Sequence, residues 1–62
     1  MKATLELKMD NAAFEHTRGA ELARILRETA DKIDGQSLNV WTDIYCRDIN
    51  GNTVGKLEIV EK

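Results

Sequence analysis

The segment from Thr17 to Gly35 constrains the fold more than any other part of the chain. Apolar or small side chains recur there every three or four positions, at Leu22, Ile25, Leu26, Thr29, Ala30 and Ile33. This spacing places them on one stripe of an α-helix. Thr17 is the expected N-cap, and Gly35 is the expected left-handed residue that ends the helix. The sequence therefore predicts one amphipathic helix whose apolar stripe must be covered by the rest of the chain. Phe14, the single phenylalanine of the chain, is expected to close one end of the core.

The other segments read as strands, because apolar and polar residues alternate in them as they do in half-buried strands. They are residues 4–9, 38–47 and 52–60. The order strand, helix, strand, strand predicts an α+β fold in a single domain of residues 1–62. It consists of a three-stranded sheet with one amphipathic helix packed on one face. A right-handed crossover allows the first strand to pair in parallel with the second, or antiparallel with the third. We favour the antiparallel order, because it places the apolar third strand in the centre.

Asn50 and Gly51 predict a hairpin between the last two strands, because both central residues of a type I′ turn require positive φ. A two-residue turn there fixes the register of the two strands. It pairs Cys46 with Gly55, Ile44 with Leu57 and Thr42 with Ile59 on the inward face. On the opposite face it pairs Arg47 with Val54, Tyr45 with Lys56, Asp43 with Glu58 and Trp41 with Val60.

One helix can cover only one side of such a sheet, so apolar side chains on the other side are expected to face water. The expected partner or dimer interface consists of Trp41, Tyr45, Arg47, Val54, Lys56 and Val60. These aromatics either mediate dimerisation or are covered by Phe14 and the termini, or they anchor a partner, since Trp and Tyr are common hot-spot residues. A charged helix face is interpreted as solvated and as a second candidate surface: Glu21, Arg24, Arg27, Glu28 and Asp31.

The sequence predicts no catalytic, cofactor or metal site. Asp43 opposite Glu58 is interpreted as a screened charge cluster rather than an acid-base pair, because lysines lie in reach and no nucleophile accompanies it. Residues 48–52 alternate like a calcium loop, but Thr53 and Ile59 replace its glycine and glutamate, so a turn is favoured. A single cysteine and a single histidine exclude an intrachain disulfide and a four-ligand zinc site.

Charge and length narrow the class of protein further. Nine basic and eleven acidic residues give a formal net charge of -2, which offers no electrostatic case for a membrane surface or for nonspecific nucleic-acid binding. The N-terminus lacks the pattern of a secretory signal, and a cytoplasmic location is expected. A chain of 62 residues has only a small core, so self-association into a homodimer is expected to supplement its stability.

Residues 10–15, 21–27, 30–33 and 47–55 together resemble a group of very small phage and prophage proteins. The resemblance covers most of the chain, and it implies a bacterial host cell as the setting. Small phage accessory proteins often act on host machinery, including defence systems, by binding rather than by catalysis. The resemblance carries no functional residues over to this chain.

These observations predict a small non-enzymatic interaction protein. As a phage or prophage accessory protein and a homodimer, it would bind and occlude a host or phage protein, for example a host-defence component. The alternative is a module that binds single-stranded nucleic acid. In that case Trp41 and Tyr45 would stack on bases, and Lys8, Arg47 and Lys56 would lie near the phosphates. The acidic balance of the chain counts against this alternative.

Overall fold

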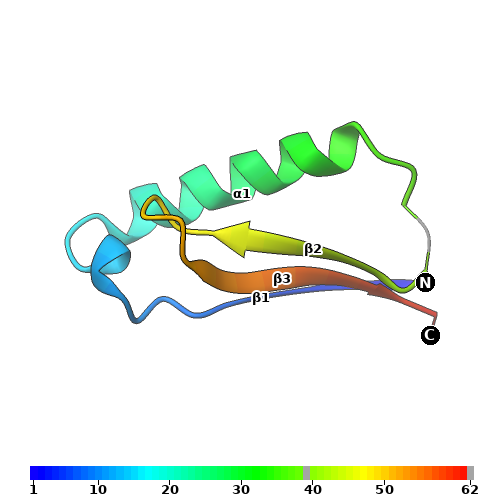
Figure 1. The fold of residues 1–62 in the computed structure, drawn as a ribbon, viewed down its shortest axis with the longest axis horizontal. Helices are drawn as coiled ribbons and strands as arrows, with labels where there is room; N and C mark the ends of the chain where they lie inside the picture. Colours follow the sequence, from blue (N-terminus) through cyan, green and yellow to red (C-terminus); the bar gives the residue numbers. More distant parts are fainter. Residues whose placement is uncertain (39, 62) are drawn as a thin grey trace.

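The computed structural model describes residues 1–38 and 40–61, arranged as a sheet with one helix beside it (Figure 1). The elements are β1 (Lys2–Leu7), the 3-10 helix η1 (Ala12–Phe14), α1 (Arg18–Asp34), β2 (Thr42–Arg47) and β3 (Thr53–Val60). β1 lies two residues earlier than predicted. β2 begins at Thr42 rather than at Leu38, because Trp41 has a φ of 67°, which ends the extended conformation. Asn39, which was assigned to that strand, lies outside the described residues.

The sheet has the strand order β1-β3-β2, and both pairs are antiparallel. The α+β fold and the favoured order, with the third strand in the centre, are therefore confirmed. The predicted inward pairs are also confirmed: Cys46 with Gly55, Ile44 with Leu57 and Thr42 with Ile59. Two of the predicted outward pairs are present as well, Tyr45 with Lys56 and Asp43 with Glu58.

The turn between β2 and β3 differs from the predicted type I′ turn. Asp48 starts it, because its carbonyl accepts the N–H of Gly51 at 3.0 Å and its own N–H donates to Asn52 O at 2.9 Å. Gly51 has a φ of 85°, whereas Asn50 does not have a positive φ. Three residues thus lie between Asp48 and Asn52, and the last of them is left-handed, as in three-residue hairpin loops. The prediction of a two-residue turn was therefore wrong, although the predicted register of β2 and β3 is present from Thr42 to Cys46.

A β-bulge follows this longer loop. The register shifts between Cys46 and Arg47, so that Arg47 pairs with Thr53 instead of Val54. Val54 is the extra residue on β3, and a bulge of this kind redirects side chains. Val54 is only 7% exposed and packs in the core with Phe14 and Cys46. The prediction that Val54 faces water was therefore wrong.

α1 begins after Thr17 and ends before Gly35, close to the predicted bounds. Neither end has the predicted cap, because the Thr17 side chain makes no capping hydrogen bond and Gly35 has a φ of -90°. The buried residues of the helix are Glu21, Ile25 and Thr29, one turn apart. The helix is therefore rotated relative to the predicted stripe, and Leu26 remains 42% exposed.

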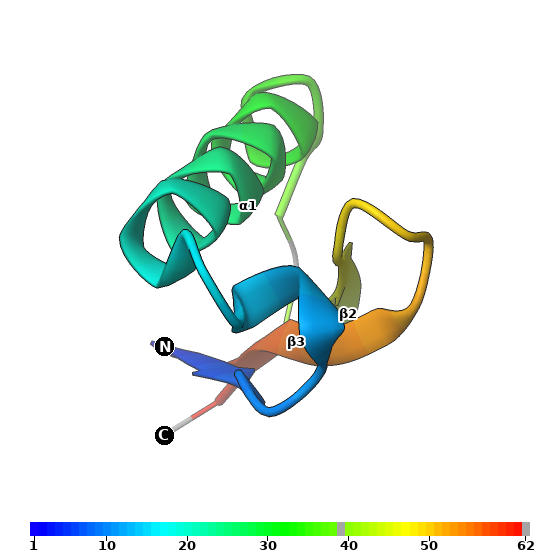
Figure 2. The same ribbon diagram turned by 90° about the vertical axis from the view of Figure 1, so that its left-hand side faces the viewer.

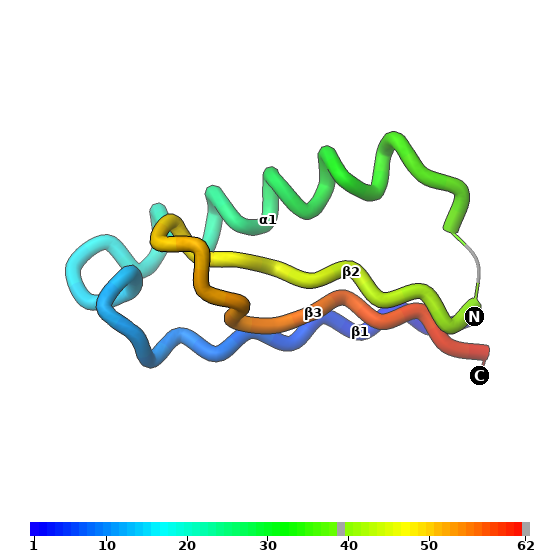
Figure 3. Tube along the Cα trace, in the orientation of Figure 1, coloured from blue at the N-terminus to red at the C-terminus, as the bar shows by residue number. Residues whose placement is uncertain are grey.

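The rotation of α1 follows from what it packs against. The helix contacts η1 and β2, whereas β1 is separated from β2 by β3 in the sheet. The Thr29 hydroxyl lies 3.4 Å from Cys46 Sγ on β2, and Phe14 fills the space beside Ile25. Figures 2 and 3 show η1 at the same end of the molecule as the β2–β3 loop. The prediction that Phe14 closes one end of the core is confirmed, since it is fully buried.

Candidate functional site

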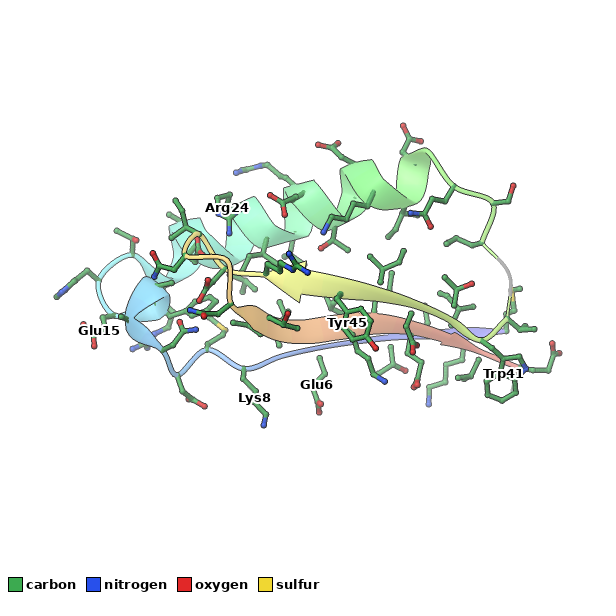
Figure 4. The ribbon with its side chains drawn as sticks, viewed as in Figure 1. Glu6, Lys8, Glu15, Arg24, Trp41 and Tyr45 are labelled. Carbon is green, nitrogen blue, oxygen red and sulfur yellow. The ribbon has the colours of Figure 1, made fainter. Side chains whose placement is uncertain are left out.

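We define the outer face as the side of the sheet turned away from α1. Figure 4 shows Glu6 and Lys8 projecting on this side, Tyr45 over the middle of the sheet, and Trp41 at the end of the sheet near the C-terminus. Alternation along each strand assigns the same side to these residues: Lys2, Thr4, Glu6, Asp43, Tyr45, Lys56, Glu58 and Val60.

Tyr45 lies in a row of side chains that crosses the sheet. The register places Lys56 opposite both Glu6 on β1 and Tyr45 on β2. The Tyr45 side chain is 54% exposed, although it stands beside the central strand. An aromatic ring in this position offers a large, rigid surface with a polar tip.

A charge cluster surrounds Lys56. Its Nζ lies 3.5 Å from a Glu58 carboxylate oxygen and 3.9 Å from one of Asp43. The negative charges of Asp43 and Glu58 raise the pKa of Lys56 above its ordinary value. The opposed carboxylates thus share a cation, as expected for a screened cluster, and this arrangement stabilises a charged surface rather than a proton-transfer pair.

A shallow hollow opens on the outer face next to this cluster. Its volume is about 240 Å³, and it is lined by Thr4, Glu6, Lys56 and Glu58. Two carboxylates and a hydroxyl give it acceptors that could receive a basic or hydrogen-bonding side chain of a partner. The hollow is partly open, and each of its lining residues carries a charged group or a hydroxyl, in contrast to the predominantly apolar residues that line small-ligand pockets.

Trp41 occupies the end of the outer face. The residue is 73% exposed and has a φ of 67°, and its backbone N–H donates to Ile59 O at 2.6 Å. A positive φ is rare for a bulky residue, and such strained positions are concentrated at functional sites. Trp41 precedes β2, so the predicted pairing with Val60 is absent. Three residues lie between Trp41 and Tyr45, and only Tyr45 belongs to β2.

The remaining residues of the predicted interface behave differently from one another. Arg47 is exposed, Lys56 and Val60 are half-buried, and Val54 is in the core. Val60 pairs with Lys2 on β1. The structure thus places Trp41, Tyr45, Lys56 and Val60 on one side of the sheet and removes Val54 from it.

The structure confirms only part of the prediction for the charged helix face. Arg27, Glu28 and Asp31 are exposed, as predicted. Glu21 is buried, at 6% exposure, and Arg24 holds it with a 2.8 Å bond from Nε, so the prediction that Glu21 is solvated was wrong. Arg24 also pairs with Glu28 at 3.1 Å.

Glu21 and Asp48 hold the β2–β3 loop, a role that the sequence did not reveal. Glu21 accepts the N–H of Ile49 at 2.8 Å, and Asp48 accepts the N–H groups of Asn50 and Asn52 and the side chain of Asn11. A signal existed for Asp48, since aspartate is favoured at the first position of a turn. Glu21 offered no signal, because its partner is distant in sequence.

These bonds determine the pKa of each carboxyl. The hydrogen bond from Arg24 lowers the pKa of Glu21, and it outweighs burial, which acts in the opposite direction. For Asp48, burial alone would raise the pKa, but the bonds from Asn52, Asn11 and Asn50 outweigh it and lower the pKa. Both groups are therefore held as carboxylates, with structural partners that leave neither available as an acid or base.

Residues 1–38 and 40–61 contain no group of three or more His, Cys, Asp or Glu side chains that could hold a metal ion. Cys46 is buried on the inward face beside Thr29. Among these residues, too, there is no helix with the length and apolar character needed to cross a bilayer.

The chain was compared with protein-family models, with curated proteins and with solved structures, and no match was found.

Proposed function

We propose that the protein is a non-enzymatic binding module that attaches to another protein through the outer face of its sheet. The observation that carries this proposal is the exposure of Trp41 and Tyr45, at 73% and 54%. Tryptophan is highly buried on average, and a chain with a single Trp gains stability by burying it. Here it is held outside the core in a rare backbone conformation.

The surroundings of the two rings fit a protein partner. Hot-spot residues are enriched in Trp and Tyr and are surrounded by polar groups that exclude water. Lys56, Glu58 and Asp43 form such a rim beside Tyr45, with the Lys56 ammonium within reach of both carboxylates. The resemblance to small phage and prophage proteins supports a host or phage protein as the partner, for example a defence component that is occluded when the module binds.

The same geometry gives less support to binding of single-stranded nucleic acid. Glu6, Asp43 and Glu58 lie on the outer face and repel phosphates, and the cation between them, Lys56, is already paired. Trp41 lies outside β2, whereas Tyr45 lies within it, so the two rings are not on neighbouring positions of one strand face where adjacent bases stack.

The test is capture from a bacterial host lysate with the immobilised protein. Proteins retained by the wild type are expected to be lost with the double variant Trp41→Ala/Tyr45→Ala. The matched control is Ile49→Ala, which removes an exposed apolar side chain from the β2–β3 loop instead of the outer face. Circular dichroism verifies that each variant is folded. Capture that is unchanged by the double variant would show that the outer face is not the binding surface.

A titration with single-stranded DNA and RNA distinguishes the protein-binding module from the nucleic-acid-binding alternative. The proposal expects no saturable binding at physiological salt. Binding that weakens with added salt and with Trp41→Ala would instead identify a nucleic-acid module.

A further inference from the structure

The two edges of the sheet differ in how they are covered. Along the free edge of β2, Arg24 donates to Arg47 O at 3.1 Å and Lys32 donates to Tyr45 O at 3.3 Å. The helix thereby caps that edge. β1 is paired with β3 on one side, and no other strand of the described residues lies beside it. An uncovered edge presents backbone donors and acceptors to another strand.

The register shows which backbone groups β1 presents. The N–H of Lys8 donates to Val54 O at 2.8 Å, which continues the β1–β3 register in which Leu7 pairs with Gly55. Because backbone groups alternate in direction along a strand, the even-numbered residues of β1 point to β3. Ala3, Leu5 and Leu7 therefore point their N–H and C=O groups to the free edge.

The side chains of β1 make this edge complementary to itself. We propose that β1 pairs antiparallel with β1 of a second copy of this chain, with Thr4 at the two-fold axis. In this register Lys2 lies opposite Glu6 of the second copy, and Ala3 lies opposite Leu5 of the second copy. Opposite charges directly across a strand pair stabilise it, and a symmetric contact forms the charge pair twice. The edge-facing groups of Ala3 and Leu5 then face each other and can exchange backbone hydrogen bonds.

Two neighbouring registers are disfavoured by the same side chains. A pairing centred on Leu5 keeps the two faces of the sheet matched but sets Lys2 opposite Lys8, with like charges across the pair. A slip by one residue sends Leu5 to the polar face. A pairing centred on Thr4 avoids like charges across the pair and keeps Leu5 on the inward face.

Exposed apolar side chains support the same occupant. Leu5 is 39% exposed on the inward face of β1, and Leu26 is 42% exposed on α1. The main contacts of the helix are with η1 and β2, so it leaves Leu5 on β1 uncovered. Pairing at Thr4 places Ala3 of the second copy against Leu5 and shields it. The pairing also joins the two outer faces into one continuous surface. This inference goes beyond the proposed function and does not depend on it.

Light scattering after size-exclusion chromatography tests the proposal. The chain has a mass of 7.0 kDa, so a dimer is expected at twice that mass. Lys2→Glu places like charges opposite each other twice and is expected to weaken the dimer roughly ten-fold. The double exchange Lys2→Glu/Glu6→Lys restores opposite charges and is expected to recover the dimer. A monomer at concentrations up to about 1 mM would overturn the proposal.

A backbone variant tests the edge independently of charge. Ala3→Pro removes an N–H that points to the free edge, a position where edge strands tolerate proline, so the fold is expected to remain and the dimer to be lost. Ala3→Ser is the matched control and keeps the dimer. Trp41→Ala/Tyr45→Ala is also expected to keep it. A dimer that survives Ala3→Pro but is lost in the double aromatic variant would show that the copies meet through the outer face, and the proposal would be wrong.

Discussion

The carboxylate of Glu21 in the first turn of α1 accepts a 2.8 Å hydrogen bond from the backbone N–H of Ile49 in the β2–β3 loop. This bond joins residues 28 positions apart, and it connects the helix to the hairpin. Arg24 fixes the same carboxylate with bonds of 2.8 and 3.1 Å. The loop is therefore held by a buried carboxylate from another element.

Replacing this carboxylate is expected to loosen the loop. Glu21→Ala leaves the Ile49 N–H without its acceptor and removes two of the hydrogen bonds of Arg24, so the melting temperature should fall by roughly 5 °C or more. The matched control is Glu28→Ala, which removes an exposed partner of Arg24 and Lys32 and should change little. Thermal unfolding followed by circular dichroism measures both. Equal effects of the two variants would show that the bond to Ile49 contributes nothing.

Acid is expected to destabilise the fold through Glu21 and Asp48. Both have a pKa below the ordinary values of 4.5 and 3.8. A carboxyl with a lowered folded-state pKa stabilises the fold above its unfolded-state value, and this stabilisation is lost as the pH falls through the folded-state pKa. The free energy of unfolding should therefore stay level from pH 7 to about 5 and decline below about pH 4.5.

Urea titrations across this range measure the decline. The double variant Glu21→Gln/Asp48→Asn should lose part of its stability at pH 7 and show a flatter profile below pH 5. A decline as steep as that of the wild type would assign the acid sensitivity to other carboxyls.

Two neighbouring residues of α1 are expected to respond very differently to truncation. Ile25 is fully buried against Phe14 and Cys46, so Ile25→Ala should cost about 2 to 5 kcal/mol. A domain of this size has a net stability of only about 3 to 5 kcal/mol, so this variant should be largely unfolded. Leu26→Ala removes a side chain that is 42% exposed and should cost about 1 kcal/mol. Chemical denaturation compares them, and similar losses would contradict the observed rotation of the helix.

Two glycines give a second matched pair. A Cβ at Gly55 would collide with the carbonyl oxygen of Glu6 and lie 2.8 Å from Leu7 Cδ2, so Gly55→Ala should disrupt the pairing of β1 with β3. Gly19 lies in α1 with no atom within 4 Å of a Cβ, and Gly19→Ala should stabilise the protein by roughly 1 kcal/mol. Amide hydrogen exchange in β1 reports the first effect. Unchanged protection there would refute it.

Trp41 is expected to be replaceable without loss of stability. Asn tolerates a left-handed conformation better than a bulky residue, so Trp41→Asn should leave the free energy of unfolding unchanged or raise it by about 1 kcal/mol. The same variant should lose partner binding in the capture experiment. A clear loss of stability would mean that the indole packs in the fold, contrary to its 73% exposure.

The hydrophobic pattern by itself determined the element order, the central position of β3, the inward pairs from Cys46/Gly55 to Thr42/Ile59, and the burial of Phe14. Each of these depends on local periodicity or on which side chains avoid water, and such properties are carried by neighbouring residues. The same local information identified Tyr45 and Trp41 as exposed, because one helix cannot cover both faces of the sheet.

Tertiary structure alone decided the rotation of α1, the burial of Glu21 and the bulge that carries Val54 into the core. Glu21 could not be distinguished from the exposed charges of its helix, because its acceptor role depends on Ile49, which the fold brings to it from 28 residues away. The alternation of its strand predicts that Val54 faces outward, but the loop from Asp48 to Asn52 shifts the register by one residue next to it. A single-residue shift reverses the face of a side chain, so the geometry of one loop outweighed the pattern of the strand.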